Sequence, residues 1–505
     1  MPRLKLEYAA GAVVAALAFS RARCPERSYD IWWHLATGRW IVEHRAIPNA
    51  EPFSYTATGA PWVAHEWLAD IGLYLVYRSA GHHGLALVRQ SIAAATCIAL
   101  YSLVLLFGAH PLLAAAGAAA LLIFLAPVTN ARPQFLLPLL TLAVLHALYR
   151  HRLGQRQAIW AVPIIALLWA NLHGGFIVLY AVLCIYLLDC LARAFALPSR
   201  KGNLSLAPVA DVLAVSGVTG IATLANPYGF EGALYPVRYV VGDLRWTTRA
   251  VTEYASPDFG KAPMNLAGLF IVALLGVFAW SRRPVELLDG LLLLFFLHGY
   301  LKWQRMVGVF GAVAIGVLCR HLAGAARLQR TSHRESQVLN IAFVIVALLF
   351  LVTGWPWLVP ESALVSHTAY PVRTLEVALL NGIRGNLLNT YHFGGYIIWR
   401  SYPQRIVFID GRADAYPKRI FDDSWLMLHG EPGWEAKLRQ YDIAWAVLDR
   451  TQPLAKILRV MPGWHVVCGD NASLLLVRDG APNESFLRRW RSGKLLLPPA
   501  ETYAR

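Results

Sequence analysis

Charged residues are scarce in this chain. They make up 15% of its 505 residues, whereas soluble proteins have roughly 25%. Cysteine is scarce too, and six cysteines in 505 residues cannot form the disulfide framework of a small secreted protein. Hydrophobic residues reach 57%, and the mean hydropathy is +0.45. These values exclude a soluble enzyme and a disordered protein, and they indicate a polytopic membrane protein.

The charge that is present is mostly basic. The chain has 46 Lys and Arg against 30 Asp and Glu, which gives a net charge of +16. In a membrane protein such an excess gathers in cytoplasmic loops, so it does not indicate a nucleic-acid partner. We expect membrane lipids, and no nucleic acid, among the partners.

Long apolar runs dominate the first 359 residues. A spanning helix needs about 20 mostly apolar residues. The sequence predicts about eleven spans, near residues 4–20, 84–107, 111–127, 133–149, 158–172, 174–191, 207–225, 264–280, 285–301, 306–322 and 338–357. Because no small-residue cleavage site precedes Arg21, we expect the first run to be a retained anchor. The short segment 68–77 is expected to form an interfacial helix instead.

Basic residues predict the orientation of these spans. They cluster in four connections, at Arg150, Arg152 and Arg156; Arg193, Arg200 and Lys201; Arg282 and Arg283; and Arg320, Arg327, Arg330 and Arg334. With eleven spans and a cytoplasmic N-terminus, all four connections face the cytoplasm. The long connections 21–83 and 226–263 then face outward. We expect a multi-pass protein of the bacterial inner (cytoplasmic) membrane.

The composition becomes ordinary after residue 359. Residues 360–505 contain no spanning run and show strand and helix patterns. The expected elements are a buried strand at 405–410, a strand at 442–449, a hairpin of 464–468 with 473–477, and helices at 370–381 and 434–441. We therefore predict a transmembrane domain over 1–359 and an extracytoplasmic α/β domain over 360–505.

The predicted topology brings polar side chains from several separate outer connections to one membrane surface. They are Asp30, His34, His65, Glu66, Arg132, Asn171, His173, Asn226, Glu253, Asp258, Lys302, Gln304 and Arg305. The cytoplasmic connections offer only scattered arginines and lysines. Ionisable groups at membrane depth are costly, so they tend to pair or to line a polar cavity. We expect a single polar pocket at the outer surface.

Such a pocket would suit transfer of a group from a lipid-linked phosphosugar. A carboxylate, preferably that of Asp30, acts as general base toward a hydroxyl or amine. Arginine forks at Arg132 and Arg305, with Lys302, suit a phosphate or diphosphate. Apolar walls suit a lipid tail. Glu66 is the expected second catalytic carboxylate.

The acidic and histidine candidates have structural alternatives. Asp30 is equally suited to capping a helix that begins at Ile31. His34 lies one helical turn after Asp30 and would share its face. His65 and Glu66 fit a helix start or a salt bridge better than half of a metal site.

The remaining candidates have alternatives as well. Arg132, Lys302 and Arg305 also suit anchoring at lipid headgroups. The glycines after His173 favour a tight turn, and Asn226 begins an Asn-Pro-Tyr-Gly turn signal.

Two features of the C-terminal region are open in the same way. Asp410, Arg412 and Asp414 follow the expected strand 405–410, where α/β folds display ligands, but a structural Asp410–Arg412 ion pair is slightly favoured. Cys24 and Cys468 are both expected outside and would be able to pair.

The order of elements resembles the GT-C class of integral-membrane glycosyltransferases, which includes oligosaccharyltransferases, protein O-mannosyltransferases and aminoarabinose transferases. A short first span precedes a long outer loop with an early acid, many spans and an outer α/β domain. The resemblance implies that the first-loop acid, here Asp30, is a catalytic base or metal ligand, so a divalent metal is possible. It also implies a polyprenyl-phosphate or diphosphate sugar donor and inverting transfer to a lipid, glycan or protein acceptor outside. Many relatives have two adjacent acids in this loop, whereas Asp30 stands alone.

Two other functions compete with a glycosyltransferase. A lipid or sugar transporter or flippase would place polar residues near the membrane midplane and contain an internal repeat, and the sequence shows no repeat. A non-enzymatic membrane assembly protein would tolerate loss of Asp30 and Glu66.

Overall fold

The structure is a computed structural model that describes residues 4–196, 206–281, 284–325 and 336–498. The chain divides into two compact units, and each is described by itself. The helical unit comprises Met1–Cys24 and Ala86–Leu358. The sheet unit comprises Pro25–Leu85 and Val359–Arg505.

The first loop of the chain belongs to the sheet unit, whereas the sequence grouped this loop with the spans. Backbone bridges explain the grouping, because Glu26 pairs with Val365 and Ser54 pairs with Val407. The amide of Val407 donates to the carbonyl of Phe53 at 3.0 Å. Segments more than 300 residues apart therefore fold together.

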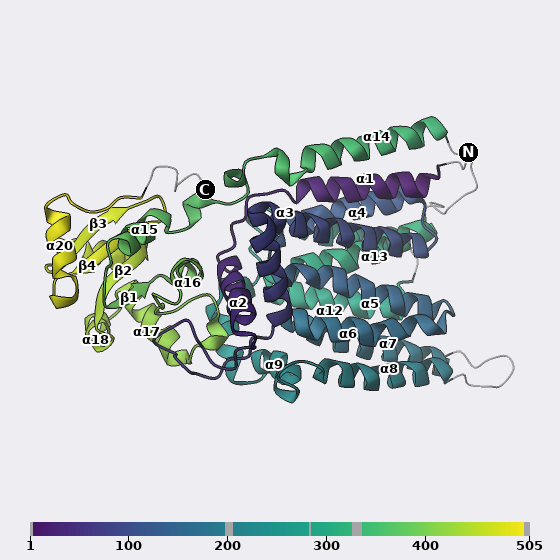
Figure 1. Cartoon of the computed structure of the whole chain (residues 1–505). Coiled ribbons are helices and arrows are strands. Elements are labelled where there is room, and N and C mark those ends of the chain that lie inside the picture. Colours follow the sequence, from purple (N-terminus) through teal and green to yellow (C-terminus); the bar gives the residue numbers. More distant parts are fainter. Residues whose placement is uncertain (1–3, 197–205, 282–283, 326–335, 499–505) are drawn as a thin grey trace. The chain divides into compact units, whose positions relative to one another are not determined.

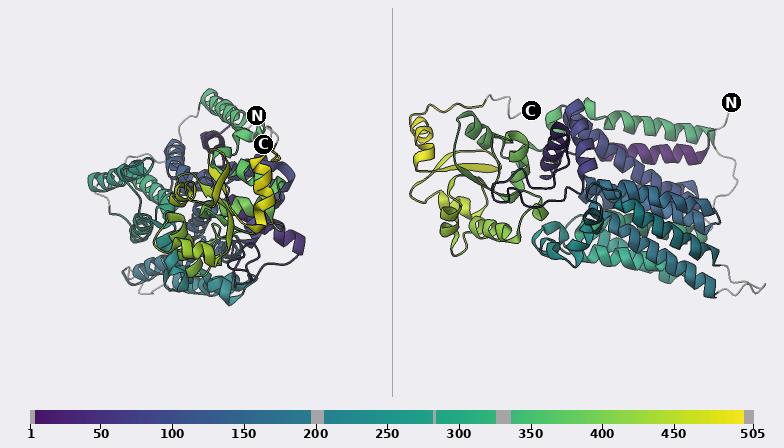
Figure 2. Two further views of the ribbon diagram at one scale, coloured as in Figure 1. Left: turned by 90° about the vertical axis from the view of Figure 1, so that its left-hand side faces the viewer. Right: turned by 60° about the horizontal axis from the view of Figure 1, so that its bottom comes forward.

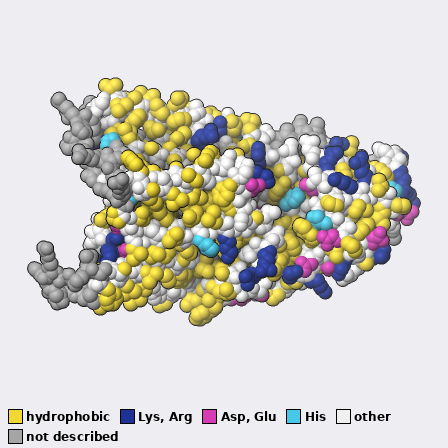
Figure 3. Space-filling view, turned by 180° about the vertical axis from the view of Figure 1, so that it is seen from behind, with side chains coloured by type: hydrophobic (Ala, Val, Ile, Leu, Met, Phe, Trp, Pro, Cys, Tyr) yellow, Lys and Arg dark blue, Asp and Glu magenta, His cyan; other side chains and the backbone are white. Residues whose placement is uncertain are grey.

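The helical unit is a bundle of long helices lying side by side (Figures 1 and 2). Its helices are α1 (Leu6–Arg21), most of α3 (Trp67–Leu106), α4 (Pro111–Leu125), α5 (Leu137–Arg152), α6 (Ala161–Leu172), α7 (Ile177–Ala196), α8 (Ala207–Leu224), α9 (Phe230–Val240), α10 (Thr247–Ala250), α11 (Met264–Ser281), α12 (Leu287–Lys302), α13 (Val307–Ala325) and α14 (Gln337–Gly354). Figure 3 shows apolar side chains over the surface of this unit.

Among the described residues, seven helices are long and apolar enough to cross a membrane, namely α3, α4, α7, α8, α11, α13 and α14. The chain is therefore a multi-pass membrane protein. The other four expected spans coincide with the shorter helices α1, α5, α6 and α12, which have 12 to 16 residues. The total of eleven spans and their orientation stay predictions. Of the basic residues that predicted the orientation, Arg200, Lys201, Arg282, Arg283, Arg327, Arg330 and Arg334 lie outside the described residues.

Two buried polar residues of α3 hold helix ends together. The Gln90 amide donates to the carbonyls of Phe19 at 2.9 Å and Gly354 at 2.7 Å, at the ends of α1 and α14. The Arg89 guanidinium donates to the carbonyl of Ala22 at 2.9 Å and to that of Cys24. Carbonyls at a helix end have no partner within their own helix, so these side chains satisfy groups that would otherwise be buried unpaired.

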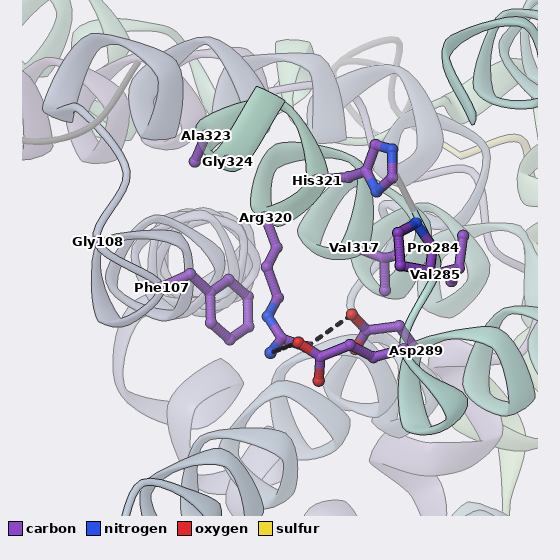
Figure 4. Close-up of a pocket in the computed structure, with 11 residues that line it drawn as sticks. Phe107, Gly108, Pro284, Val285, Asp289, Val317, Arg320, His321, Ala323 and Gly324 are labelled. Carbon is purple, nitrogen blue, oxygen red and sulfur yellow. Dashed lines mark hydrogen bonds and ion pairs between the residues drawn. The ribbon is translucent and has the colours of Figure 1, made fainter. Parts of the chain in front are cut away.

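An ion network joins α5, α7, α12 and α13 beside a cavity of about 530 Å³ (Figure 4). Arg320 bridges Glu286 at 2.6 Å and Asp289 at 2.7 Å. Arg152 contacts the same Glu286 at 2.6 Å, and Asp189 pairs with Arg193 at 3.0 Å and Arg152 at 3.6 Å. The expectation of scattered cations at this end was wrong, because these three arginines are matched by three carboxylates.

The sheet unit surrounds a four-stranded sheet with the order β1-β2-β4-β3. Its elements are α2 (Ile31–His44), the start of α3, α15 (Val372–Leu380), β1 (Asn386–Asn389), α16 (Gly394–Ser401), α17 (Lys418–His429), α18 (Trp434–Gln440), β2 (Ile443–Asp449), α19 (Pro453–Leu458), β3 (Trp464–Gly469), β4 (Ser473–Arg478) and α20 (Glu484–Arg491). β1 and β2 are parallel, and β4 is antiparallel to both β2 and β3. The predicted β2, β3–β4 hairpin, α15 and α18 are confirmed.

The strand expected at 405–410 is wrong. Only Val407 forms a bridge there, with Ser54. The side chain of Asn389 bonds to this segment instead, since its amide donates to the Ile409 carbonyl at 2.7 Å and its oxygen accepts from the Phe408 amide at 3.0 Å. The Asn389 side chain thus forms hydrogen bonds with the backbone groups of Phe408 and Ile409 that would otherwise pair with a neighbouring strand. Cys24 and Cys468, which the predicted topology would allow to pair, are both free.

Helix α3 is interrupted at Gly81, whose φ of 54° and ψ of −145° are not helical. Glycine takes this backbone conformation at little cost. The amide of His82, which restarts the helix, donates to the Glu361 carboxylate at 2.8 Å. The segment 67–80 is therefore a helix distinct from the following span. This separation agrees with the short helix expected at 68–77, whose interfacial position stays a prediction.

A buried guanidinium lies at the centre of the sheet unit. Arg412 is paired with Asp410 at 2.6 Å and with Glu51 at 2.7 Å. Its guanidinium carbon lies 4.8 Å from the ring centre of Phe53 and 4.5 Å from that of Trp62. Burial lowers the pKa of Arg412, but the charges of Asp410 and Glu51 outweigh burial and raise it. The favoured Asp410–Arg412 ion pair is confirmed, and Glu51 is a second carboxylate partner of Arg412.

Replacing this cation should destabilise the sheet unit. Arg412→Met leaves two carboxylates buried without their partner, which costs about 3–5 kcal/mol. We expect a lower thermal midpoint for the full-length protein and faster hydrogen exchange in peptides covering residues 51–62 and 405–416. Arg439→Met, at an exposed ion pair with Glu435, is the matched control. Equal exchange in both variants would contradict a central role for Arg412.

Candidate functional site

Asp30 lies at the start of α2 but does not cap it. Its backbone is helical, with φ −77° and ψ −26°, and its side chain makes no capping hydrogen bond. The helix begins at Ile31, as expected, but the capping role proposed for Asp30 is wrong. The carboxylate of Asp30 is half-buried.

The Asp30 carboxylate faces the backbone of Gly411. A Cβ atom at position 411 would lie 2.6 Å from Asp30 Oδ1 and 3.2 Å from Trp33 Nε1, so a side chain there would displace the Asp30 carboxylate. Tyr391 donates from its hydroxyl to the Gly411 carbonyl at 2.8 Å. Gly411 lies between Asp410 and Arg412, so the buried ion pair fixes the loop against which Asp30 lies.

A second set of polar groups lies on α2 and at the start of α3. His34 Nδ1 and Asp70 Oδ1 share a hydrogen bond of 2.6 Å, and His34 Nδ1 lies 3.9 Å from Glu66 Oε2. His65 Nε2 lies 3.8 Å from Glu66 Oε1. The structure brings these three predicted residues together. Asp70 was missed, although its position four residues after Glu66 places both acids on one helix face.

The side chains of His34, His65, Glu66 and Asp70 contact one another. His34 is buried, and its Nδ1 is hydrogen-bonded to Asp70. Among the described residues, no group of three or more His, Cys, Asp or Glu side chains is arranged to hold a metal ion. The part of the chain that the structure describes therefore does not fit a metal site of that kind.

Sequence reasoning also missed a pair at the carboxyl ends of β1 and β2, where parallel strands commonly display functional groups. His392 Nε2 lies 3.4 Å from Asp449 Oδ2. The hydrogen bond from His392 holds the pKa of Asp449 down at about 2. The His392 ring also lies 4.5 Å from that of Tyr29, the residue before Asp30. His392 and Asp449 are 57 positions apart, so no local pattern predicted their contact.

In the helical unit, Glu253 brings two predicted arginines together. Arg132 donates to Glu253 at 2.6 Å. The Arg305 guanidinium lies 4.5 Å from the ring centre of Tyr254. Burial raises the pKa of Glu253, but the charges of Arg132 and Arg305 outweigh burial and lower it. Two guanidiniums and one carboxylate leave a net charge of +1 here.

The neighbouring turn between α12 and α13 supports these arginines. Gln304 donates to the Thr252 carbonyl at 2.8 Å through its side chain and to the Ala255 carbonyl at 2.9 Å through its backbone. The ammonium of Lys302 is exposed and lies 4.6 Å from the Trp303 ring centre. The turn is therefore fixed, while Lys302 reaches outward.

His173 and Asn226 make the turn contacts that their structural alternatives predicted. His173 Nδ1 accepts from the Gly175 amide at 2.9 Å. Asn226 accepts from the Tyr228 amide at 2.8 Å and donates to the Gly229 carbonyl at 3.0 Å. Both turns begin segments that line an apolar groove.

This groove lies between α7, α8 and α9 and has a volume of about 560 Å³. Its walls include Phe176, Ile221, Phe230, Leu234 and Val237. Cβ atoms added at Gly217 and Gly220 would meet no neighbour within 4 Å, so these glycines open the wall of the groove. An apolar groove of this size suits a hydrocarbon chain.

The predicted site residues thus form separate sets. Asp30, His34, His65 and Glu66 lie in the sheet unit. Arg132, His173, Asn226, Lys302 and Arg305 lie in the helical unit. The prediction that they share one pocket stays a prediction.

Comparisons with known proteins identify the fold. No family model matches the sequence, and no curated protein is similar to it. The structure is similar to that of the oligosaccharyltransferase AglB from Archaeoglobus fulgidus in complex with an inhibitory peptide and a dolichol-phosphate, with a TM-score of 0.52, 12% identity, and coverage of 87% of this chain and 69% of that chain. The apo form of the Archaeoglobus fulgidus oligosaccharyltransferase gives the same values. The expected similarity to GT-C membrane glycosyltransferases is confirmed at the level of the fold.

Proposed function

We propose that this protein is a membrane glycosyltransferase that moves a sugar from a polyprenyl-phosphate or polyprenyl-diphosphate donor to an acceptor outside the cytoplasm. The observation that carries the proposal is the GT-C-like fold with an acid, Asp30, early in the first loop. Its carboxylate lies against Gly411, in the loop that the Asp410–Arg412 ion pair holds in place.

The donor would be bound by the helical unit. The similar archaeal protein binds dolichol-phosphate, which has an isoprenoid tail and a phosphate. This chain has an apolar groove for a tail and a net positive pair, Arg132 with Arg305, for the phosphate. Guanidinium forks bind phosphate oxygens with two hydrogen bonds each. Lys302 is an exposed further cation for a diphosphate.

The transfer would follow an inverting displacement. The Asp30 carboxylate takes the proton from the acceptor hydroxyl or amine, and the freed electron pair forms the new bond to the anomeric carbon of the sugar. The bond from that carbon to the phosphate oxygen breaks on the opposite side. The electron pair of that bond leaves with the polyprenyl phosphate, whose negative charge Arg132 and Arg305 stabilise.

The polar groups on α2 and α3 would orient this base. Asp70 fixes the ring of His34, which lies one turn after Asp30 on the same helix. Glu66 and His65 extend this set and stay candidates for contact with the sugar. The proposed location is the bacterial inner membrane, with the sheet unit outside.

Asp30→Asn should abolish transfer while leaving the fold intact. Loss of a general base lowers the rate by roughly 10²–10⁴-fold, so we expect kcat to fall at least about 100-fold with little change in the donor KM. The measurement is turnover of a polyprenyl-phosphate sugar by the full-length protein in lipid nanodiscs. Glu43→Gln, at an exposed acid of the same helix, is the control. Unchanged turnover in Asp30→Asn would remove Asp30 from the mechanism.

Glu253→Gln should strengthen binding of a phosphate. The change raises the net charge beside Arg132 and Arg305 from +1 to +2, so we expect inorganic pyrophosphate to bind about fivefold more tightly at low salt. In the wild-type protein the lowered pKa keeps Glu253 ionised at neutral pH. Protonation of Glu253 removes its negative charge, so the pyrophosphate affinity of the wild-type protein should rise as the pH falls through the pKa of Glu253. The Glu253→Gln variant has no carboxylate at this position, so its affinity should not show this rise.

The matched control for Glu253→Gln is Asp258→Asn, which removes an exposed acid of the same connection, paired with Lys261 at 2.9 Å. This control should leave pyrophosphate affinity unchanged. Thermal midpoints of both variants show whether the arginines remain placed. Equal or weaker binding by a stable Glu253→Gln protein would count against an anion site at these arginines.

A further inference from the structure

Helix α17 carries a row of aromatic rings on its exposed side. Phe421, Trp425 and His429 follow one another at intervals of four residues, which places them on one face of the helix. The opposite face is buried and includes Ile420, Met427 and Leu428. Trp425 is 50% exposed. The Trp425 ring is therefore not needed to fill the core of the sheet unit, whereas Phe421 and His429 are partly buried.

The largest ring of the row is held in place before anything binds. The Trp425 and His429 rings are stacked, with centres 3.8 Å apart and an angle of 26° between them. Trp425 Nε1 donates to Glu431 at 3.2 Å, and His429 Nδ1 contacts the Trp425 carbonyl at 2.9 Å. A ring that is already ordered loses little conformational entropy when a ligand packs on it. Trp425 is thus a fixed flat surface.

The row leads toward Asp30 through contacts within the sheet unit. The Phe421 ring meets that of Tyr391 edge to face, with centres 5.6 Å apart. The Tyr391 hydroxyl bonds to the carbonyl of Gly411, the residue against which the Asp30 carboxylate lies. The aromatic surface and the proposed base therefore belong to one connected set of residues.

Polar groups flank the rings, and they comprise one ammonium and two carboxylates. Lys418 is paired with Asp422 at 2.6 Å on the exposed side of the helix. Glu431 adds a carboxylate at the edge of Trp425. An anionic membrane surface would be attracted by unpaired lysines and arginines, which this side does not concentrate. A sugar ring instead has an apolar face of C–H groups, which packs on an aromatic ring, and a rim of hydroxyls, which donate to carboxylates.

We infer that the α17 row (Phe421, Trp425 and His429) binds the acceptor, and that the acceptor is a glycan whose sugar units lie along the row toward Asp30. The inference rests on the proposed transferase function and names its acceptor class. Phe421 and the stacked Trp425–His429 pair start from helix positions about 6 Å apart along the axis, so they offer two successive contacts to a chain of sugars rather than one contact to a single sugar.

Oligosaccharide binding by the full-length protein in phosphatidylcholine nanodiscs tests the inference. The probes are maltohexaose, cellohexaose and chitohexaose, each titrated calorimetrically without donor. We expect the wild-type protein to bind at least one of them, and Trp425→Ala to weaken that binding about tenfold. Trp425→Phe keeps a ring and should retain most of the affinity. Val460→Ala, at an 83% exposed position of the same unit, should have no effect.

The outcomes separate this inference from the proposed function. Asp30→Asn should bind the oligosaccharide normally and fail to transfer sugar to it. A wild-type protein that transfers sugar but binds none of the three probes would overturn the glycan acceptor and leave the transferase function standing. Equal binding by Trp425→Ala and the wild-type protein would overturn the role of the row. Binding that depends on Trp425 without any transfer would support the row and count against the transferase.

Discussion

The sheet unit depends on the buried cation of Arg412. Its guanidinium lies between two carboxylates and two aromatic rings, and three of those four partners, Glu51, Phe53 and Trp62, come from the first loop. The remaining partner, Asp410, lies about 350 residues later in the chain. A fully buried charge is stable only with its partners in place. Folding of the C-terminal residues therefore requires the first loop, and this requirement also places Gly411 beside Asp30.

The elements that sequence predicted well are those whose pattern is local. An apolar run of about 20 residues is recognisable without its neighbours, and so is a hairpin such as β3–β4. The strand expected at 405–410 failed because a strand is defined by its partner. Its apolar pattern is that of a strand, but Asn389 holds its backbone groups through a side chain. β1 was missed for the related reason that its sequence, Asn-Leu-Leu-Asn, has the asparagines that strands disfavour.

The candidate site, too, could be predicted from the sequence only where the signal is local. Unusual polar residues such as Asp30, His34 and Arg305 stand out in an apolar sequence, so they were identified as candidates. Their pairings were not predicted, because Glu253 lies 121 residues from Arg132, and Asp449 lies 57 residues from His392. Asp70 was missed as well, although its helical interval from Glu66 would have been sufficient to find it. Sequence thus identifies the charged groups, whereas long-range contacts decide which of them are neutralised.

Two charged regions of the helical unit differ in how far their charges are neutralised. Around Arg320 the network of three arginines and three carboxylates is balanced, and each acid has a cation within 3.0 Å. Such a network joins helices without attracting a further charge. At Arg132 and Arg305 one glutamate faces two cations, and the excess positive charge lies in the same unit as an apolar groove. The proposed lipid donor, with its anionic headgroup, would match the second region and not the first, because its negative charge would offset the excess positive charge of the two arginines.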